Sequence, residues 1–330
     1  MFNRYFLIFI LISVLFFSCK TSTNRLDVDI SDIKIKKIKI QRYGQALFTL
    51  EKNNLKEELK RLQPEFRIFL DGDLNDTLKI YDFISDTLLI SVSEDCNKVY
   101  PNLNELELEL TKALKHYRYY YPKGIIPEIY TYISGFDYEY PVQYYDNNLL
   151  IALDMYLGEN YPKYKNLGLP AYRIRKFRKE YIARDCMNEI ARSKINYKRT
   201  GSTLLDLMMN EGKILWFIDA MMPDVEDSLK IDYTEKQMKW AEDNEGYIWA
   251  FLIENELLYS TEKQKLQKFI LDSPFTSYFG NESPPRLGWW IGWQIVREYM
   301  NNHTGISLNE LMNEYDAQKI LSKSGYKPGR

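Results

Sequence analysis

Two acidic side chains one helical turn apart are the residues of this sequence best placed to do chemistry. Asp185 and Glu189 stand at positions i and i+4 of a segment with helical spacing, so their carboxylates should lie on one helix face. Phe177 and Tyr181 continue the same stripe toward the N-terminus and should point inward. Because an isolated buried carboxylate is costly unless it is paired or bound to a metal, this placement marks a candidate site.

An ordinary solvent-facing helix surface explains the same carboxylates. Arg192 follows Glu189 by three residues and Arg184 adjoins Asp185, so local ion pairs could neutralise both acids. Such pairs are common on exposed helices, and each contributes only about 0–1 kcal/mol. The residues alone leave both interpretations open.

Glu211 adds a third carboxylate on the next predicted helix, and Gly212 follows it. Oxygen ligands of this kind suit Ca²⁺, Mg²⁺ or Mn²⁺ better than zinc, so a residual metal site made by Asp185, Glu189 and Glu211 is one hypothesis. Arginine or lysine neighbours would satisfy the same carboxylates without a metal, and we favour that arrangement. We therefore expect no cofactor. Gly212 lies inside a helix, where glycine is unfavourable, and it predicts a close approach of another element.

Cys186 lies between the two acids and is a candidate nucleophile. A nucleophilic cysteine needs a nearby base, usually histidine, and the chain has only His116 and His303, both distant in sequence. A small buried hydrophobe is the more usual role for such a cysteine. Cys96 and Cys186 could pair in an oxidising compartment, although their spacing does not require it.

The elements that must position these residues fall into two parts. The first part is predicted to contain strands at 33–40, 125–134 and 148–157, helices at 55–62 and from Pro101 to about 120, and a short element at 66–70. After a loop at 158–170, the chain is predicted to be almost wholly helical from about 172 to 330, with helices at 172–194, 202–221, 234–259, 261–271, 288–300 and 307–314. A small sheet followed by a helical C-terminal part predicts an α+β fold, which we expect to form a single domain over residues 28–330.

The N-terminus has the features of a secretory signal peptide. Arg4 precedes an apolar stretch over residues 5–17, which is too short for a membrane-spanning helix of about 20 residues. Ser18 and Cys19 resemble the cleavage site of bacterial lipoproteins, although Phe16 stands where leucine is commoner. We predict cleavage before Cys19, which makes residues 1–18 the signal peptide.

Lipid on Cys19 would attach the mature chain to a membrane through a polar tether over residues 19–27. Each buried methylene contributes about 0.8 kcal/mol, and two or more acyl chains give stable attachment. Lys20, which is not acidic, follows the cysteine, and in bacterial lipoproteins this favours the outer membrane. No acidic cluster that would resemble a surface-export tag follows, so we expect the body to face the periplasm.

The overall composition excludes some classes of protein. The formal net charge is -2 and no basic stripe is present, so we expect no nucleic-acid partner. Hydrophobic residues make up 45% and charged residues 27% of the chain, which is typical of a globular protein rather than a disordered one.

The order of these motifs resembles a zinc peptidase of the HExxH class with a downstream glutamate ligand. In that class two histidines one turn apart bind zinc, and the glutamate beside the first acts as general base. Here Asp185, Cys186 and Glu189 take those three positions, and only Glu211 matches in type. The resemblance implies a zincin-like scaffold that lacks the histidine ligands.

Over nearly its whole length the chain also resembles the gliding-motility lipoprotein GldB family of the Bacteroidetes. The resemblance rests on the lipobox at Cys19 and on the segments 149–158, 185–191, 211–212 and 288–299. It implies a non-enzymatic cell-envelope lipoprotein that is required for gliding, with protein partners in the gliding or secretion machinery. Two other functions remain open, which are a metal-binding hydrolase or peptidase with an altered site and a periplasmic module that binds peptide or peptidoglycan.

Overall fold

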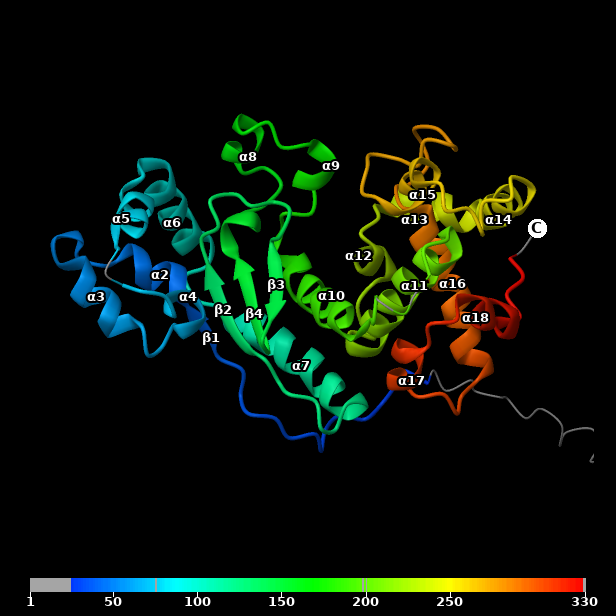
Figure 1. Ribbon diagram of the computed structural model, residues 1–330, viewed down its shortest axis with the longest axis horizontal. Helices are drawn as coiled ribbons and strands as arrows, with labels where there is room; N and C mark the ends of the chain where they lie inside the picture. Colours follow the sequence, from blue (N-terminus) through cyan, green and yellow to red (C-terminus); the bar gives the residue numbers. More distant parts are fainter. Residues whose placement is uncertain (1–24, 75, 198, 200, 329–330) are drawn as a thin grey trace, which may run out of the picture.

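The computed structural model describes residues 25–74, 76–197, 199 and 201–328. The predicted signal peptide (1–18) and the predicted lipidation site, Cys19, lie outside these residues. Figure 1 shows a small sheet flanked on both sides by helices, so the α+β expectation is confirmed. Within the described residues, no helix has both the length and the apolar content needed to cross a bilayer.

Helices dominate the N-terminal part more than the sequence suggested, and they lie on one side of the sheet (Figure 1). The predicted helix at 55–62 and the short element at 66–70 are confirmed. The pair α5–α6 was not predicted, although Asp86 caps α6 by accepting from the backbone N–H groups of Leu88 and Leu89. The helices are α2 (Tyr43–Phe48), α3 (Leu55–Leu62), α4 (Arg67–Leu70), α5 (Leu78–Ser85) and α6 (Thr87–Val99).

The helix predicted to begin at Pro101 is α7 (Asn104–Tyr120), which begins three residues later and ends just before Tyr121 and Pro122. Its buried face carries apolar residues at helical spacing, which are Leu106, Leu110, Ala113, Leu114 and Tyr117. Figure 1 places α7 beneath the sheet.

The sheet has four strands in the order β1-β2-β4-β3. β1 and β4 both run parallel to β2, whereas β3 pairs antiparallel with β4 and forms one edge. The β3–β4 turn uses Asp146 and Asn147 at φ 46° and 59°, which suits a tight two-residue hairpin. The strands are β1 (Ile40–Arg42), β2 (Glu128–Tyr132), β3 (Val142–Tyr145) and β4 (Asn148–Ala152).

The strands predicted at 125–134 and 148–157 were right in place but too long, the strand predicted at 33–40 was wrong, and β3 was not predicted. Of the strand predicted at 33–40, only Ile40 belongs to β1, because β1 pairs with β2 through three residues alone. Ile38 and Ile40 are buried, so the alternating pattern there reflects one-sided burial rather than a long ladder. The strands predicted at 125–134 and 148–157 shorten to β2 and β4.

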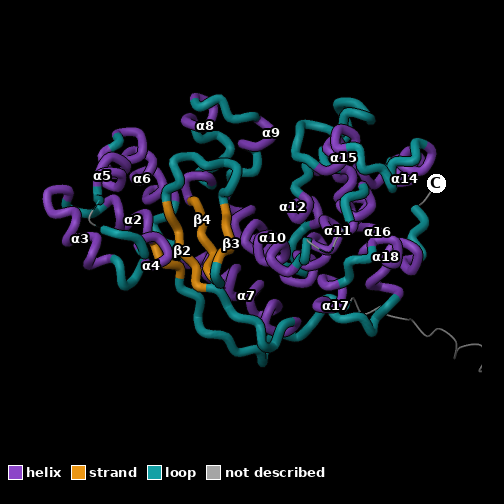
Figure 2. Tube along the Cα trace, viewed as in Figure 1, coloured by secondary structure: helices purple, strands orange, loops and turns teal. Residues whose placement is uncertain are grey.

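The C-terminal part is helical, as predicted, and Figure 2 shows no strand in the described residues after 171. The helix predicted at 202–221 is α11, which begins with a capping box made by Thr203 and Asp206. The helices are α8 (Pro162–Asn166), α9 (Ala171–Ile174), α10 (Ile182–Lys194), α11 (Leu204–Met221), α12 (Asp227–Ile231), α13 (Glu235–Asp243), α14 (Glu245–Glu254), α15 (Lys263–Ile270), α16 (Leu287–Asn302), α17 (Leu308–Asn313) and α18 (Ala317–Ser324).

Two long helix predictions were wrong because the chain changes direction within them. The segment 172–194 consists of α9, a short 3-10 helix and α10, and Arg178 between them has an extended backbone. Phe177 and Tyr181 therefore do not share a helix with Asp185, although both are buried. The segment 234–259 divides at Asn244 into α13 and α14.

The packed body begins earlier than the tether prediction of 19–27 implies. Arg25 donates hydrogen bonds to backbone carbonyls near the end of α16, and Leu26 is buried in the core. Leu26 belongs to the same cluster of buried apolar side chains as Ile320, so this core joins both parts of the chain. A smaller cluster lies under α2–α5.

Gly212 permits a close crossing of α11 and α16, as its position in a helix predicted. A Cβ atom on Gly212 would lie 2.3 Å from the carbonyl oxygen of Gly292, and one on Gly292 would lie 2.0 Å from that of Met208. The two helix backbones therefore touch directly, and only glycine fits on either side. This contact fixes where the aromatic residues of α16 lie against α11.

Gly212→Ala should lower the free energy of unfolding by about 1–3 kcal/mol or more, because the added methyl group overpacks the α11–α16 crossing. Urea denaturation of the purified domain measures this change. Gly305→Ala is the matched control, since a Cβ there meets nothing within 4 Å, and it should alter stability by no more than about 1 kcal/mol. Equal effects of the two substitutions would contradict the close crossing.

Candidate functional site

Asp185 and Glu189 line a cavity of about 440 Å³ that is rich in charged side chains. One wall is α10, and a second comes from residues 138–142 at the start of β3. A third wall comes from Asp232, Asp272 and Arg286 in the C-terminal part. The cavity lining holds Arg173, Lys176, Arg184, Arg192 and Arg286 together with Glu139, Asp185, Glu189, Asp232 and Asp272.

Asp185 is held by two neighbours. Its Oδ1 accepts from Arg184 Nη1 at 2.8 Å, and its Oδ2 accepts from the Tyr156 hydroxyl at 2.8 Å. Arg184 is buried and also donates through Nε to the carbonyl oxygen of Lys230 at 2.8 Å. The carboxylate is thus fixed against the cavity wall by a cation and a phenol.

Glu211 is paired with Arg192, which connects α10 to α11. Arg192 Nη1 and Nη2 donate to the two Glu211 oxygens at 3.1 and 2.8 Å, a two-point contact that sets the orientation of both groups. Burial alone would lower the pKa of Arg192, but the Glu211 carboxylate outweighs it and raises that pKa above its usual value. The Glu211 side chain is only 11% exposed, and Arg192 contacts both of its oxygens.

Glu189 lies at the edge of the same pair. Its Oε1 is 4.0 Å from Arg192 Nε and accepts from Asn188 Nδ2 at 3.0 Å. Burial raises the pKa of Glu189 above its ordinary value, since Arg192 offsets only part of the desolvation. One guanidinium therefore lies against Glu189 and Glu211, two of the three acids of the predicted site.

Cys186 faces the core rather than the cavity. It is fully buried, and burial followed by the nearby charges of Asp185 and Glu189 raises the pKa of its thiol well above the usual value. The thiol therefore stays protonated, and the thiolate is the form that reacts. Cys96 is also buried, and the two cysteines are free, which answers the open question of a disulfide.

The geometry gives no support to the hypothesis of a three-carboxylate metal site. Among the described residues, no group of three or more His, Cys, Asp or Glu side chains is placed so that it could hold a metal ion. Arg192 contacts both Glu189 and Glu211, so a positive charge already lies where a metal shared by these carboxylates would need to sit.

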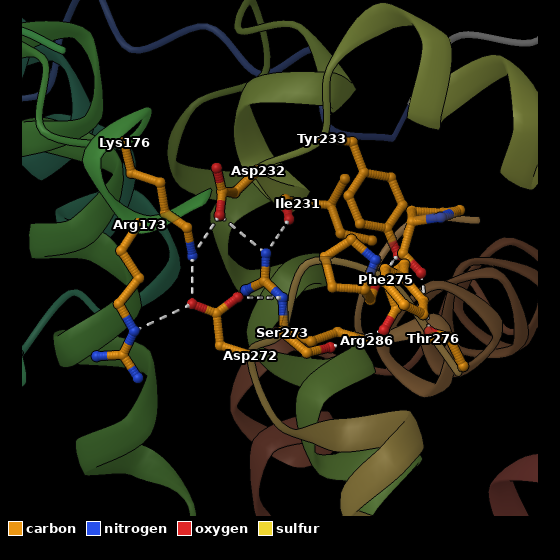
Figure 3. A network of polar contacts seen from close by, with 12 residues as sticks. Arg173, Lys176, Ile231, Asp232, Tyr233, Asp272, Ser273, Phe275, Thr276 and Arg286 are labelled. Carbon is orange, nitrogen blue, oxygen red and sulfur yellow. Dashed lines mark hydrogen bonds and ion pairs between the residues drawn. The ribbon is translucent and has the colours of Figure 1, made fainter. Parts of the chain in front are cut away.

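A second charged cluster, centred on Asp232, was missed by the sequence reasoning (Figure 3). Asp232 forms an ion pair with Lys176 Nζ at 2.8 Å and accepts a hydrogen bond from Arg286 Nη2 at 2.9 Å, and its side chain is 2% exposed. Asp272 also contacts Lys176, at 2.9 Å, and lies 3.7 Å from Arg286 Nε. Burial by itself would raise the pKa of Asp232, but the surrounding cations, Lys176 and Arg286 foremost, hold it below the ordinary value.

Trp289 of α16 links the two charged clusters. The guanidinium of Arg192 lies 5.5 Å from its ring centroid and that of Arg286 lies 4.4 Å from it, so the indole contacts a cation from each cluster. Within the aromatic run at 288–299, Trp290 and Trp293 are buried in the core. Trp289 instead packs against Arg192 and Arg286, two of the arginines that line the cavity.

No short-range pattern pointed to the Asp232 cluster. Asp232 follows α12 in a left-handed conformation at φ 63°, and Arg286 precedes α16 at φ 54°. Aspartate tolerates this conformation after a helix, which is the one local signal available. Its partners lie more than fifty positions away in sequence, and only the folded chain brings them together.

Comparison with known protein families gives a match over most of the chain. A family model described as gliding motility protein GldB matches residues 23–328. No curated protein and no solved structure matches the chain. The zincin-like arrangement therefore stays a prediction.

Asp232→Asn should destabilise the protein in a way that depends on pH. The pKa of Asp232 is depressed in the folded state, so its carboxylate stabilises the fold above the unfolded-state pKa of about 3.9 and loses that effect as pH falls below it. Urea denaturation at pH 7, 5, 4 and 3 should show a difference from wild type that is largest at pH 7 and shrinks toward pH 3. A difference that stays constant over this range would contradict the ion-pair account.

Proposed function

This chain belongs to the GldB family of gliding motility proteins, and we propose that it acts in gliding as a lipid-anchored, non-enzymatic component of the cell envelope. The family assignment links it to gliding motility. The lipid anchor, the absence of catalysis and the position in the envelope are our proposals.

The observation that carries the non-enzymatic proposal is the Arg192–Glu211 ion pair. In a metallopeptidase of the class that the motif order resembles, the corresponding groups face a metal ion and a water molecule. Here a guanidinium binds both oxygens of Glu211 and approaches Glu189. The cavity wall is therefore neutralised by fixed protein cations. The thiol of Cys186 is buried and protonated, so it does not supply a nucleophile for a metal-independent hydrolase either.

The proposal for location rests on the N-terminal sequence. Ser18 and Cys19 form the lipobox-like site, and Lys20 favours sorting to the outer membrane with the body in the periplasm. We propose that the partners are proteins of the gliding or secretion machinery. Such partners would contact a folded body whose charged cavity is preformed.

Gliding should depend on the anchor and not on groups that a hydrolase would need. In a strain that lacks the gene, Cys19→Ser should fail to restore colony spreading, because the protein leaves the membrane fraction. Glu189→Gln and Cys186→Ala should restore it, since neither change touches the anchor. Single-cell gliding speed and immunoblots of membrane fractions are the measurements.

The non-enzymatic proposal fails if Glu189→Gln or Cys186→Ala abolishes gliding while the variant accumulates and unfolds at the wild-type urea concentration. Full gliding with Cys19→Ser would instead overturn the anchor. The two parts of the proposal are thus tested separately.

A second candidate function, binding of a peptide or of a peptidoglycan-derived chain in the cavity, is favoured by two polar atoms on α10. Arg184 and Asn188 line the cavity, and within the described part of the chain their Nη2 and Oδ1 atoms are buried just beneath its surface without hydrogen-bond partners. They stand four residues apart, so they share one helix face. If these two side chains turn toward the cavity, a peptide unit offers a carbonyl to the first and an N–H to the second.

The edge strand β3 offers a second contact for such a chain. The backbone N–H of Ala152 donates to the carbonyl of Pro141 at 2.9 Å, so this pair is a hydrogen-bonded one. Hydrogen-bonded and non-hydrogen-bonded pairs alternate along an antiparallel ladder, so the backbone N–H and C=O groups of Val142 and Tyr144 point away from β4. An extended chain beside β3 would use these groups as a fifth strand does. Val142 itself lines the cavity.

Asn188→Ala should weaken binding of stem peptides released from peptidoglycan by about five- to tenfold, the cost of one lost hydrogen bond. Isothermal titration calorimetry measures the affinity. Asn160→Ala is the control, because Asn160 is exposed and lies outside this cavity, and it should bind like wild type. Absence of binding by wild type at millimolar peptide would exclude this second function.

A further inference from the structure

Arg25, the first described residue, is fastened to the end of α16. Its Nη2 donates to the carbonyl oxygen of Ile306 at 2.8 Å, and its Nη1 donates to that of Met300 and reaches that of His303 at 3.5 Å. Helix carbonyls in the last turn lack partners within the helix and attract cations. The guanidinium also lies 5.9 Å from the ring centroid of Trp216 in α11.

The chain that follows Arg25 is held at both ends. Leu26 packs in the main core, and Ile38 packs in the same cluster just before β1. Figure 1 shows this segment running from α17 beneath α7 to β1, so it joins the C-terminal helices to the sheet. A force applied to the N-terminus would therefore act first on the C-terminal helices.

The distance from the anchor to this clamp is short. About six residue steps separate Cys19 from Arg25, and an extended chain spans at most about 3.3–3.6 Å per residue, so the two lie within roughly 20 Å of each other. This limit is set by covalent geometry and holds for any conformation of the intervening residues.

We infer that the end of α16, marked by Arg25, Asn301 and Thr304, is the membrane-proximal face of the protein, and that α2–α6 project away from the bilayer. The inference rests on the proposed lipidation of Cys19. The occupant of this face is the phospholipid headgroup surface. Figure 1 places α3 and α17 on opposite sides of the sheet. The end that carries α3 would therefore lie farther from the membrane surface than the end that carries α17.

The charge of this face indicates that the tether, rather than attraction to lipid, sets the orientation. Arg25, Asn301 and Thr304 line an open cavity of about 1120 Å³ whose lining has six acidic and four basic side chains. Such a surface is not drawn to anionic headgroups. The orientation should therefore be the same on neutral and on anionic membranes.

Fluorescence quenching on vesicles tests the inference with the full lipoprotein. Thr304→Cys and Asn53→Cys each place one exposed thiol, near the clamp and in the turn before α3, while Cys96 and Cys186 are buried and escape labelling. Vesicles of phosphatidylethanolamine, with or without phosphatidylglycerol, carry a small fraction of headgroup-spin-labelled lipid. The label at position 304 should be quenched several-fold more than the label at position 53 on both membranes.

Two comparisons separate this inference from the proposed anchor. Flotation of the unlabelled protein with vesicles reports whether the native lipid is present. The quenching is repeated on a chain whose residues 19–24 are supplied as a synthetic dipalmitoyl peptide, so the orientation is tested even if native lipidation fails.

A flexible glycine-serine insert of about 20 residues after Asn24 should reduce the difference in quenching between the two labels, because its average span of roughly 25 Å relaxes the limit on the distance between Cys19 and Arg25. Equal quenching of the two labels, or stronger quenching at position 53, on the synthetic anchor would overturn the inference.

Discussion

The ion pair between Arg192 and Glu211 is the interaction on which the centre of this molecule depends. It connects α10, which packs against β3 and α7, to α11, which crosses α16 at Gly212. The same guanidinium lies over Trp289 of α16, so three helices meet around one partly buried cation. Removing Arg192 would leave the Glu211 carboxylate, which is 11% exposed, without its partner, and this is costly. The sheet side and the C-terminal helices are thus joined by a charged contact as well as by the apolar core.

This contact also decides what the cavity can do. Carboxylates that converge in a cleft can hold a metal, activate water or bind a cation, and each of these requires that they lack a fixed partner. Here Asp185 is held by Arg184 and Tyr156, while Glu189 and Glu211 share Arg192. The cavity is therefore lined by charged groups that already have partners within the protein. That surface suits a role in recognition or assembly, which agrees with our non-enzymatic proposal.

The sequence predicted the parts of the fold that depend on local patterns. Helices α3 and α11 follow from the spacing of leucines and from a capping residue, and the glycine inside α11 correctly indicated a close contact. Local patterns failed where distant contacts decide the outcome. The helix predicted at 172–194 is broken because its first half supplies Arg173 and Lys176 to partners such as Asp232 and Asp272. The candidate residues on α10 and α11 could be chosen from sequence, whereas the Asp232 cluster could not, because residues far apart in the chain assemble it.

A double-mutant cycle on Arg192 and Glu211, measured by urea denaturation at pH 7, tests the central claim most directly. If the pair replaces a metal as the partner of these carboxylates, Arg192→Met alone should lower the free energy of unfolding by about 3–5 kcal/mol, and adding Glu211→Leu should restore most of the loss. Wild-type stability should be the same with and without a chelator. An Arg192→Met variant as stable as wild type, or a wild-type protein that a chelator destabilises, would contradict the account.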